Sequence, residues 1–320
     1  MFMATFLVIA AILLAGNILI EKSYLSKPVF WGISFSPKYA KQLNLDPKQI
    51  YASILELGVK NVRLSAYWDE IEPEKDHFDF TDLEYFVNQA REHRVKIILA
   101  VGYKLPRWPE CRAPQWLEIS DLRERQLIMI EEVIKHFDQN PTVTAFQLEN
   151  EPLLDFGVCP AVDRTFLNEE AAFVRSLTNK PIIITDAGEL RPWRTPMKLS
   201  DIFGTTLYRK VYNNIFGDFY YPIPAWHYRL KSDLVRKFFA PENSKTIISE
   251  LQAEPWVSQP IQDLPLEEQI KKFPLSHLKE TVQYAKRTGI DEIYFWGVEW
   301  WYYLANHGHP EYLEYAKSLF

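Results

Sequence analysis

The sequence predicts an α/β protein built as a single (β/α)₈ barrel that is preceded by an N-terminal hydrophobic helix. From residue 29 onward, eight short β-prone runs alternate with amphipathic helical segments. Several of these runs are continuously apolar, which is typical of buried parallel strands. The chain has 320 residues, enough for one such barrel of about 250 residues. A doubly wound sheet is the alternative, but no Gly-rich phosphate loop follows the first predicted strand.

The elements follow one another in a regular order. The predicted strands cover residues 29–34, 62–66, 95–101, 143–149, 181–185, 202–207, 246–249 and 293–296. The predicted helices cover residues 46–57, 81–93, 121–137, 163–177, 231–239, 266–286 and 310–318. Two helices carry start signals: Asp46 precedes Pro47 as an N-cap, and Thr81 followed by Glu84 forms a capping-box pattern. The segment 191–200 is short and holds two prolines, so the fifth helix is the weakest unit of the pattern.

The N-terminal segment is apolar. Residues 1–20 contain no charged side chain, and a helix of about 1.5 Å per residue would let them cross a hydrocarbon core of about 30 Å. A cleaved signal peptide is the alternative, although the segment lacks a basic n-region. We therefore expect a membrane anchor or signal segment at 1–22 and the barrel at 23–320. Lys22 and Lys27 by themselves favour a cytoplasmic body, but we expect an extracytoplasmic barrel, which would be secreted if the segment is cleaved.

The composition narrows the classes of function. Hydrophobic residues make up 47% of the chain and charged residues 24%, as in a globular protein with a large core. The net charge is −6 and no basic block of five or more occurs, which argues against nucleic-acid binding. Cys111 and Cys159 follow the third and fourth predicted strands and would lie on adjacent loops. The sequence leaves two states of these cysteines open: a disulfide, which fits an oxidising compartment, or two free thiols.

Two glutamates stand where predicted strands end. The apolar run 142–148 leads into Glu149-Asn150-Glu151-Pro152, and proline stops the strand from continuing. Further along, the run 245–249 leads into Glu250. The carboxyl ends of barrel strands hold the chemistry of such proteins, and cleavage of a glycosidic bond needs two carboxyl groups. We predict Glu151 as acid/base and Glu250 as nucleophile, with no metal and no organic cofactor.

Polar residues near these glutamates are candidates for substrate binding. Asn150 would donate to a sugar hydroxyl. Arg63 lies inside the second predicted strand and needs a partner, because an isolated buried charge is costly. That partner is either the nucleophile or a structural carboxylate such as Glu149, which could instead bind substrate. Tyr208 follows the sixth strand and could either hydrogen-bond the nucleophile or pack as an aromatic.

Aromatic residues are abundant, at 15% of the chain with ten tryptophans. Many fall in predicted loops, where flat rings could stack on sugars, although loop packing is the alternative. We predict substrate contacts for Tyr103, for Trp296 at the end of the eighth strand, and for Trp300. Glu72, which precedes a proline in the second loop, is interpreted as a structural element. The pair His307 and His309 lacks a convincing third ligand, so no metal site is predicted.

These motifs resemble those of clan A glycoside hydrolases. The segment 147–151 is similar to the acid/base motif of the family 35 and family 42 β-galactosidases, and 250–252 to the nucleophile segment of family 42. The segment 68–73 resembles the second-strand loop of such enzymes, whereas Asn-Glu-Pro is closer to family 5 cellulases and mannanases. The resemblance implies a retaining glycosidase that acts on an oligo- or polysaccharide, and we expect a monomer. A transglycosylase with the same pair and an inactive carbohydrate-binding barrel are the alternatives.

Overall fold

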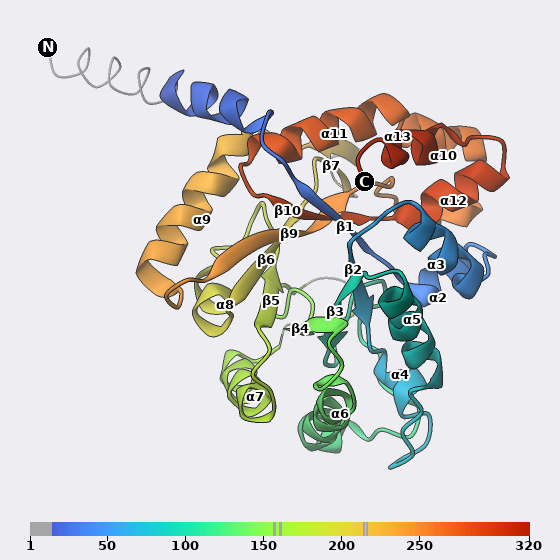
Figure 1. Ribbon diagram of the computed structural model, residues 1–320, viewed down its shortest axis with the longest axis vertical. Helices are drawn as coiled ribbons and strands as arrows, with labels where there is room; N and C mark the ends of the chain where they lie inside the picture. The colour runs from blue at the N-terminus through green and yellow to red at the C-terminus, as the bar shows by residue number, and fades with distance from the viewer. Residues whose placement is uncertain (1–14, 156–157, 160–161, 214, 216) are drawn as a thin grey trace, which may run out of the picture.

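The computed structural model describes residues 15–155, 158–159, 162–213, 215 and 217–320. Eight parallel strands close a barrel in the order β1-β10-β9-β6-β5-β4-β3-β2 (Figure 1). They are β1 (Phe30–Ser34), β2 (Asn61–Ser65), β3 (Lys96–Val101), β4 (Val143–Leu148), β5 (Ile182–Asp186), β6 (Ile202–Leu207), β9 (Lys245–Gln252) and β10 (Glu292–Trp296). The predicted (β/α)₈ barrel is confirmed.

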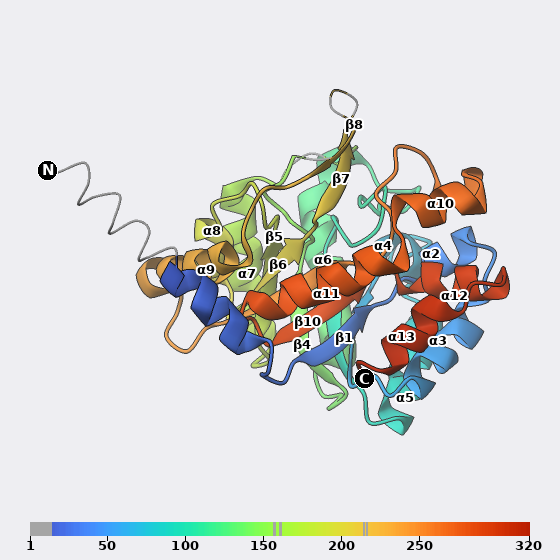
Figure 2. The ribbon, with the colours of Figure 1, turned by 90° about the horizontal axis from the view of Figure 1, so that it is seen from above.

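Helices surround the barrel (Figure 2). The predicted ones are α3 (Pro47–Glu56), α5 (Thr81–Glu92), α6 (Leu122–Phe137), α7 (Arg164–Leu177), α9 (Ala225–Phe239), α11 (Leu275–Arg287) and α13 (Glu311–Lys317), and the weak fifth unit contains α8 (Arg194–Leu199). The predicted helix 266–286 is split into α10 (Leu266–Lys272) and α11. Pro274 separates the two because it cannot continue a helix.

The sequence pattern missed several short elements. These are α2 (Pro37–Gln42), α4 (Trp68–Ile71), α12 (Val298–Asn306) and an antiparallel hairpin of β7 (Lys210–Asn213) and β8 (Gly217–Tyr220). The N-cap at Asp46 is confirmed, since its carboxylate accepts the N–H groups of Lys48 and Gln49. The predicted cap at Thr81 is wrong: Phe80 is the N-cap, and the Asp79 carboxylate accepts the Thr81 N–H.

The barrel interior has an apolar layer and a polar layer. The apolar layer consists of Ile98, Ala145, Ile183, Ile247 and Tyr294. Gly32 completes it, because a Cβ there would lie 2.6 Å from the Tyr294 ring. Two residues further along four of these strands, the buried residues are Ser34, Gln147, Thr185 and Ser249. Since side chains alternate between the faces of a strand, this polar layer lies at the carboxyl end of the barrel.

The N-terminal helix covers residues 15–24 in the described part of the chain. It is attached to α9, because Arg229 donates to the Asn17 side chain at 2.8 Å and the Trp226 N–H donates to the Glu21 carboxylate. Most of the predicted anchor, residues 1–14, lies outside the described residues. Within the described residues, we find no helix that is both long and apolar enough to cross a bilayer.

Candidate active site

Glu151 lies at the mouth of the barrel, just after β4. Its backbone is left-handed, with φ of 44°, and its N–H donates to the Thr185 hydroxyl at 2.8 Å. The Thr206 hydroxyl donates to its carboxyl group at 3.2 Å. Burial raises the pKa of Glu151 well above its usual value, and the charges of Glu250 and Glu110 raise it further. Such a rise favours the protonated form of the carboxyl group, which is the form that a general acid needs.

Glu250 lies in β9 and both of its oxygens accept hydrogen bonds. Arg63 donates to Oε1 at 2.8 Å, and the Tyr208 hydroxyl donates to Oε2 at 2.8 Å. Burial raises the pKa of Tyr208 well above its usual value, and the charges of Glu250 and Glu151 add to the rise. Tyr208 therefore stays protonated as a donor. Thr206, which donates to Glu151, pairs with Glu250 in the neighbouring strand, so the two glutamates lie on the same side of the barrel mouth.

A bulge in β9 directs Glu250 into the barrel. Along β6, Thr205 pairs with Ile248 but Thr206 pairs with Glu250, so β9 contains one extra residue at this point. The register with β10 shifts in the same region. Ile247 faces the interior and Ile248 packs in the outer core, so simple alternation would turn Glu250 outward. The extra residue reverses that direction, as bulges next to active sites often do.

Arg63 connects Glu250 to the residues that precede Glu151. Its guanidinium donates to Gln147 at 2.6 Å, Ser34 at 3.3 Å, Glu250 at 2.8 Å and Asn150 at 2.7 Å. Of the two partners predicted for Arg63, the structure has the nucleophile candidate Glu250. Arg63 and Asn150 are each only 1% exposed. Their shared hydrogen bond fixes the orientation of the amide beside the acid, while their direct contact with a sugar stays a prediction.

Glu149 has neither of the roles predicted for it. Its carboxylate accepts the N–H groups of Tyr103 at 2.8 Å and Lys104 at 2.6 Å, and the Gln126 amide at 2.6 Å. It therefore points to α6, away from Arg63 and the mouth, because its left-handed backbone (φ of 58°) interrupts the strand alternation. A Cβ at Gly102 would lie 2.3 Å from this carboxylate, so only glycine fits there. Burial raises the pKa of Glu149 to about 7.

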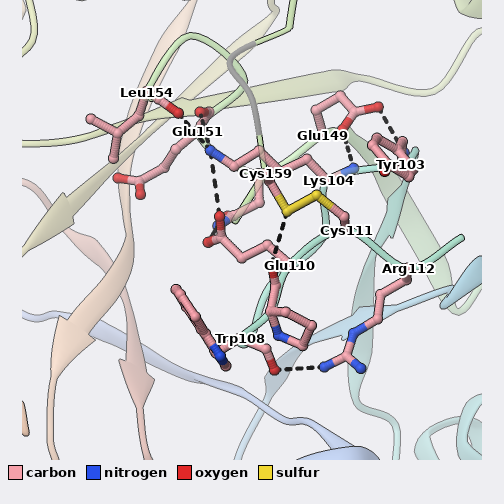
Figure 3. The surroundings of a disulfide bond; sticks show 12 residues. Tyr103, Lys104, Trp108, Glu110, Cys111, Arg112, Glu149, Glu151, Leu154 and Cys159 are labelled. Carbon is pink, nitrogen blue, oxygen red and sulfur yellow. Dashed lines mark hydrogen bonds and ion pairs between the residues drawn. A yellow bond between two sulfur atoms is a disulfide. The ribbon is translucent and has the colours of Figure 1, made fainter. Parts of the chain in front are cut away.

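Glu110 is a third carboxyl group at the mouth, and sequence reasoning missed it. The Lys104 ammonium lies 3.4 Å from its carboxylate, and the Asn150 amide donates to it at 3.1 Å. Figure 3 shows Lys104 among Glu110, Glu151 and Leu154, next to a disulfide. Burial raises the pKa of Glu110 to about 7, and the charge of Glu250 adds to the rise. Only its place in the loop after the third strand could have drawn attention to Glu110.

Cys111 and Cys159 form the disulfide in Figure 3, with their Cα atoms 5.6 Å apart. The sequence left a disulfide and two free thiols open, and the structure has the disulfide. The bridge joins the loop after β3, which carries Glu110, to the loop after β4, which carries Glu151. It thus ties together two sides of the mouth.

Trp296 lies at the end of β10, as predicted, but one face of its ring is covered. The Arg107 guanidinium lies 4.1 Å from the Trp296 ring and 3.7 Å from the Tyr39 ring. Arg107 also pairs with Glu254 and, at 3.5 Å, with Glu299. Sequence reasoning missed this cluster, because its members come from loops far apart in the chain. A role of the other Trp296 face in sugar stacking stays a prediction.

Trp300 is not at the mouth, so its predicted contact with substrate is wrong. Its ring is fully buried, and its N–H donates to Gln269 at 2.9 Å. The reason is α12, which begins after Gly297 (φ of 101°) and turns Trp300 toward Phe273 and Tyr312.

Two further loop residues can be placed. Tyr103 gives its N–H to Glu149, while its half-buried side chain packs on the main core; its contact with substrate stays a prediction. The structural interpretation of Glu72 is confirmed. Its buried carboxylate accepts the Trp68 indole N–H at 2.8 Å and the Asp76 N–H at 2.9 Å, and it pairs with Arg125.

The comparisons with known proteins agree with this picture. The family model described as β-galactosidase, of glycoside hydrolase family 42, matches residues 44–126. This part contains Arg63, the second-strand loop and Glu110, but neither Glu151 nor Glu250. A search of curated proteins finds no match to the sequence.

Solved structures of glycoside hydrolases share the fold. A GH5_18 protein from Bifidobacterium longum subsp. infantis is 15% identical, with a TM-score of 0.58 over 84% of this chain and 69% of that one. A family 39 glycoside hydrolase from Bacteroides cellulosilyticus is 16% identical, with a TM-score of 0.52 over 85% and 56%. The β-galactosidase of Halorubrum lacusprofundi is 14% identical, with a TM-score of 0.56 over 83% and 52%. The resemblance to clan A TIM-barrel glycoside hydrolases is thereby confirmed.

Proposed function

We propose that the protein is a retaining glycoside hydrolase that cleaves a β-linked glycoside by double displacement. The observation that carries the proposal is the contrast between two carboxyl groups at one barrel mouth. Glu151 has a raised pKa, whereas Glu250 is in an ion pair with Arg63 and accepts a hydrogen bond from Tyr208. Two carboxyl groups with opposite environments are what an acid and a nucleophile require.

In the first step, Glu151 donates its proton to the glycosidic oxygen while Glu250 attacks the anomeric carbon. The bond between this carbon and the leaving oxygen breaks, and the leaving group departs as an alcohol. Glu250 is then an ester, and it no longer carries the charge that helped to raise the pKa of Glu151. The pKa of Glu151 therefore falls at the stage when a base is needed.

In the second step, the Glu151 carboxylate takes a proton from water, and the oxygen of that water attacks the anomeric carbon. The ester bond breaks, Glu250 leaves as a carboxylate, and Glu151 is protonated again. The sugar keeps its β configuration because the anomeric carbon is inverted twice. Arg63 and Tyr208 hold the departing carboxylate in place throughout.

The substrate that we propose is a β-linked oligo- or polysaccharide. A GH5_18 structure from Streptomyces cattleya holds a β1-4-linked disaccharide of mannose and GlcNAc, and a solved relative from an Opitutaceae bacterium is described as an exo-β-1,4-mannosidase. A panel of nitrophenyl β-glycosides, led by the mannoside and the galactoside, is therefore the first screen. Products that carry the sugar on a second glycan would identify a transglycosylase, and glycan binding without turnover would identify an inactive barrel.

The test of the residue assignment uses azide as an external nucleophile. With an activated aryl β-glycoside, Glu250→Ala and azide should yield the α-glycosyl azide, while Glu151→Ala and azide should yield the β-glycosyl azide. These opposite anomers follow because azide replaces the nucleophile in one variant and the water in the other. Glu254→Ala, which changes another buried glutamate of the same strand-end region, should give no glycosyl azide. A Glu250→Ala variant that retains parental turnover without azide would refute the assignment.

We also propose that the barrel lies outside the cytoplasm. The Cys111–Cys159 disulfide supports this location, because such bonds persist in oxidising compartments. Added protease should digest the barrel in cells whose outer envelope has been removed but whose cytoplasmic membrane is intact. Protection until the cells are lysed would place the barrel in the cytoplasm and contradict the proposal.

A further inference from the structure

The outer side of α9 carries an unusual row of exposed apolar side chains. Leu230, Leu234 and Phe238 are spaced by four residues and so lie along one side of the helix. Leu234 is 49% exposed and Phe238 is 67% exposed. The opposite side of α9, with Tyr228 and Ser232, is buried against the barrel. Exposed apolar side chains that lie together along one side of a helix, rather than singly, indicate a surface that contacts something apolar.

The N-terminal helix adds further apolar side chains beside this row. Figure 2 shows this helix next to α9, and Asn17 and Glu21 attach it there by accepting hydrogen bonds from α9. The exposed large apolar residues of the two helices are Ile18, Leu19, Ile20, Leu230, Leu234, Phe238 and Phe239. We call this set the α9 face. Two segments more than half the chain apart thus lie side by side, and each exposes large apolar side chains.

Basic residues outnumber acidic ones on α9, although Lys231 points inward over the buried Trp193 ring. The helix carries Arg229, Lys231, Arg236 and Lys237 against the single acid Asp233, although the whole chain has a net charge of −6. The Lys237 ammonium lies over the Phe238 ring at 5.8 Å. A helix with an apolar row flanked by Lys and Arg is typical of helices that lie in the surface of an anionic bilayer.

The residues that precede the N-terminal helix also favour a lipid bilayer as the partner of the α9 face. Residues 1–14 contain no charged side chain and connect directly to the helix at 15–24. A segment of this composition favours a lipid environment, so it would bring the α9 face close to the lipid. A second copy of the chain is the competing partner, but two copies of α9 would oppose one positive helix to another.

We propose that the α9 face lies on an anionic lipid bilayer, so that one side of the barrel rests on the membrane surface. The helices of such a barrel run alongside its strands. The barrel axis then lies along the membrane, and the mouth with Glu151 and Glu250 opens sideways over the lipid headgroups. This contact is independent of the catalytic proposal, because it uses none of the residues at the mouth.

The test measures whether lipid covers this face in the full chain. Leu234→Cys is labelled with an environment-sensitive fluorophore and reconstituted into vesicles of phosphatidylcholine and phosphatidylglycerol. The matched control is Ile119→Cys, another exposed apolar position outside α9, and the native cysteines are protected by their disulfide. We expect a blue shift at 234 and several-fold stronger quenching by spin-labelled lipid than at 119. Equal quenching at the two positions would overturn the proposal.

A second position and a second lipid keep the result interpretable. Phe238→Cys should behave like Leu234→Cys, so a local disturbance at one site cannot explain the signal. Vesicles of phosphatidylcholine alone should reduce the quenching at both positions, because they lack the charge that attracts the basic residues. A label that is shielded from water but not quenched by the lipid probe, together with a dimer in sedimentation, would mean that a second copy covers the face.

Discussion

Arg63→Met is the substitution that tests the centre of the site most directly. Methionine is similar in length but carries no charge and no donor. The change removes the cation beside Glu250, whose side chain is 4% exposed. It also leaves the oxygens of Gln147 and Asn150 without their donor. A buried carboxylate that loses its counter-charge destabilises the folded protein, because the desolvation cost is no longer offset.

The size of the effect can be worked from these contacts. Removal of one partner of a buried ion pair costs about 3–5 kcal/mol, and each unpaired buried acceptor costs about 1–3 kcal/mol. These costs do not add fully, because Tyr208 still donates to Glu250 and water can enter from the mouth. We therefore expect a loss of about 4 kcal/mol in the free energy of unfolding. Activity should fall as well, since Glu250 and Asn150 lose their fixed positions.

The assay is urea unfolding of the full chain, followed by tryptophan fluorescence. The matched control is Arg123→Met, which breaks a surface pair with Asp163 of similar length, 2.9 Å, between side chains 58% and 50% exposed. An exposed pair is worth at most about 1 kcal/mol, so the control should unfold almost like the parent. An Arg63→Met variant within about 1 kcal/mol of the parent would refute the argument that this buried pair holds the site together.

Three further changes test other parts of the molecule. Glu110→Gln removes a charge that raises the pKa of Glu151, so the alkaline limb of kcat/KM should move to lower pH. An alkaline limb at the same pH as in the parent would contradict this. Burial raises the pKa of Glu299 from 4.5 to about 7. The parent therefore loses stability as the pH rises through this window, because the folded state holds a proton that the unfolded state has released. Glu299→Gln does not titrate, so its free energy of unfolding should rise relative to that of the parent by up to about 3 kcal/mol between about pH 4 and about pH 8. Urea unfolding at both pH values checks this, and a stability difference between variant and parent that does not change with pH would contradict the argument. The double change Cys111→Ser and Cys159→Ser opens a link between residues 48 positions apart and should cost about 4 kcal/mol by chain entropy. Reductant should lower the unfolding midpoint of the parent but leave this variant unchanged.

The sequence by itself determined the barrel and the end of it that carries the candidate site. Alternation of apolar runs and helical segments predicted all eight strands, since both periodicities are local properties of the chain. Proline after Glu151 and the apolar run before Glu250 located both glutamates at the carboxyl ends of their strands. Position along a strand follows from the chain order alone, so these assignments needed no knowledge of neighbours.

Only the tertiary structure decided the directions in which side chains point and which distant loops meet. The bulge that turns Glu250 inward is visible only against β6 and β10, and the left-handed backbone at Glu149 sends that carboxylate to α6. Glu110 reaches the mouth through its contacts with Lys104 and Asn150, and Trp300 is buried because α12 turns it into the core. The direction of a side chain depends on register and packing between strands, which are long-range properties that no local pattern encodes.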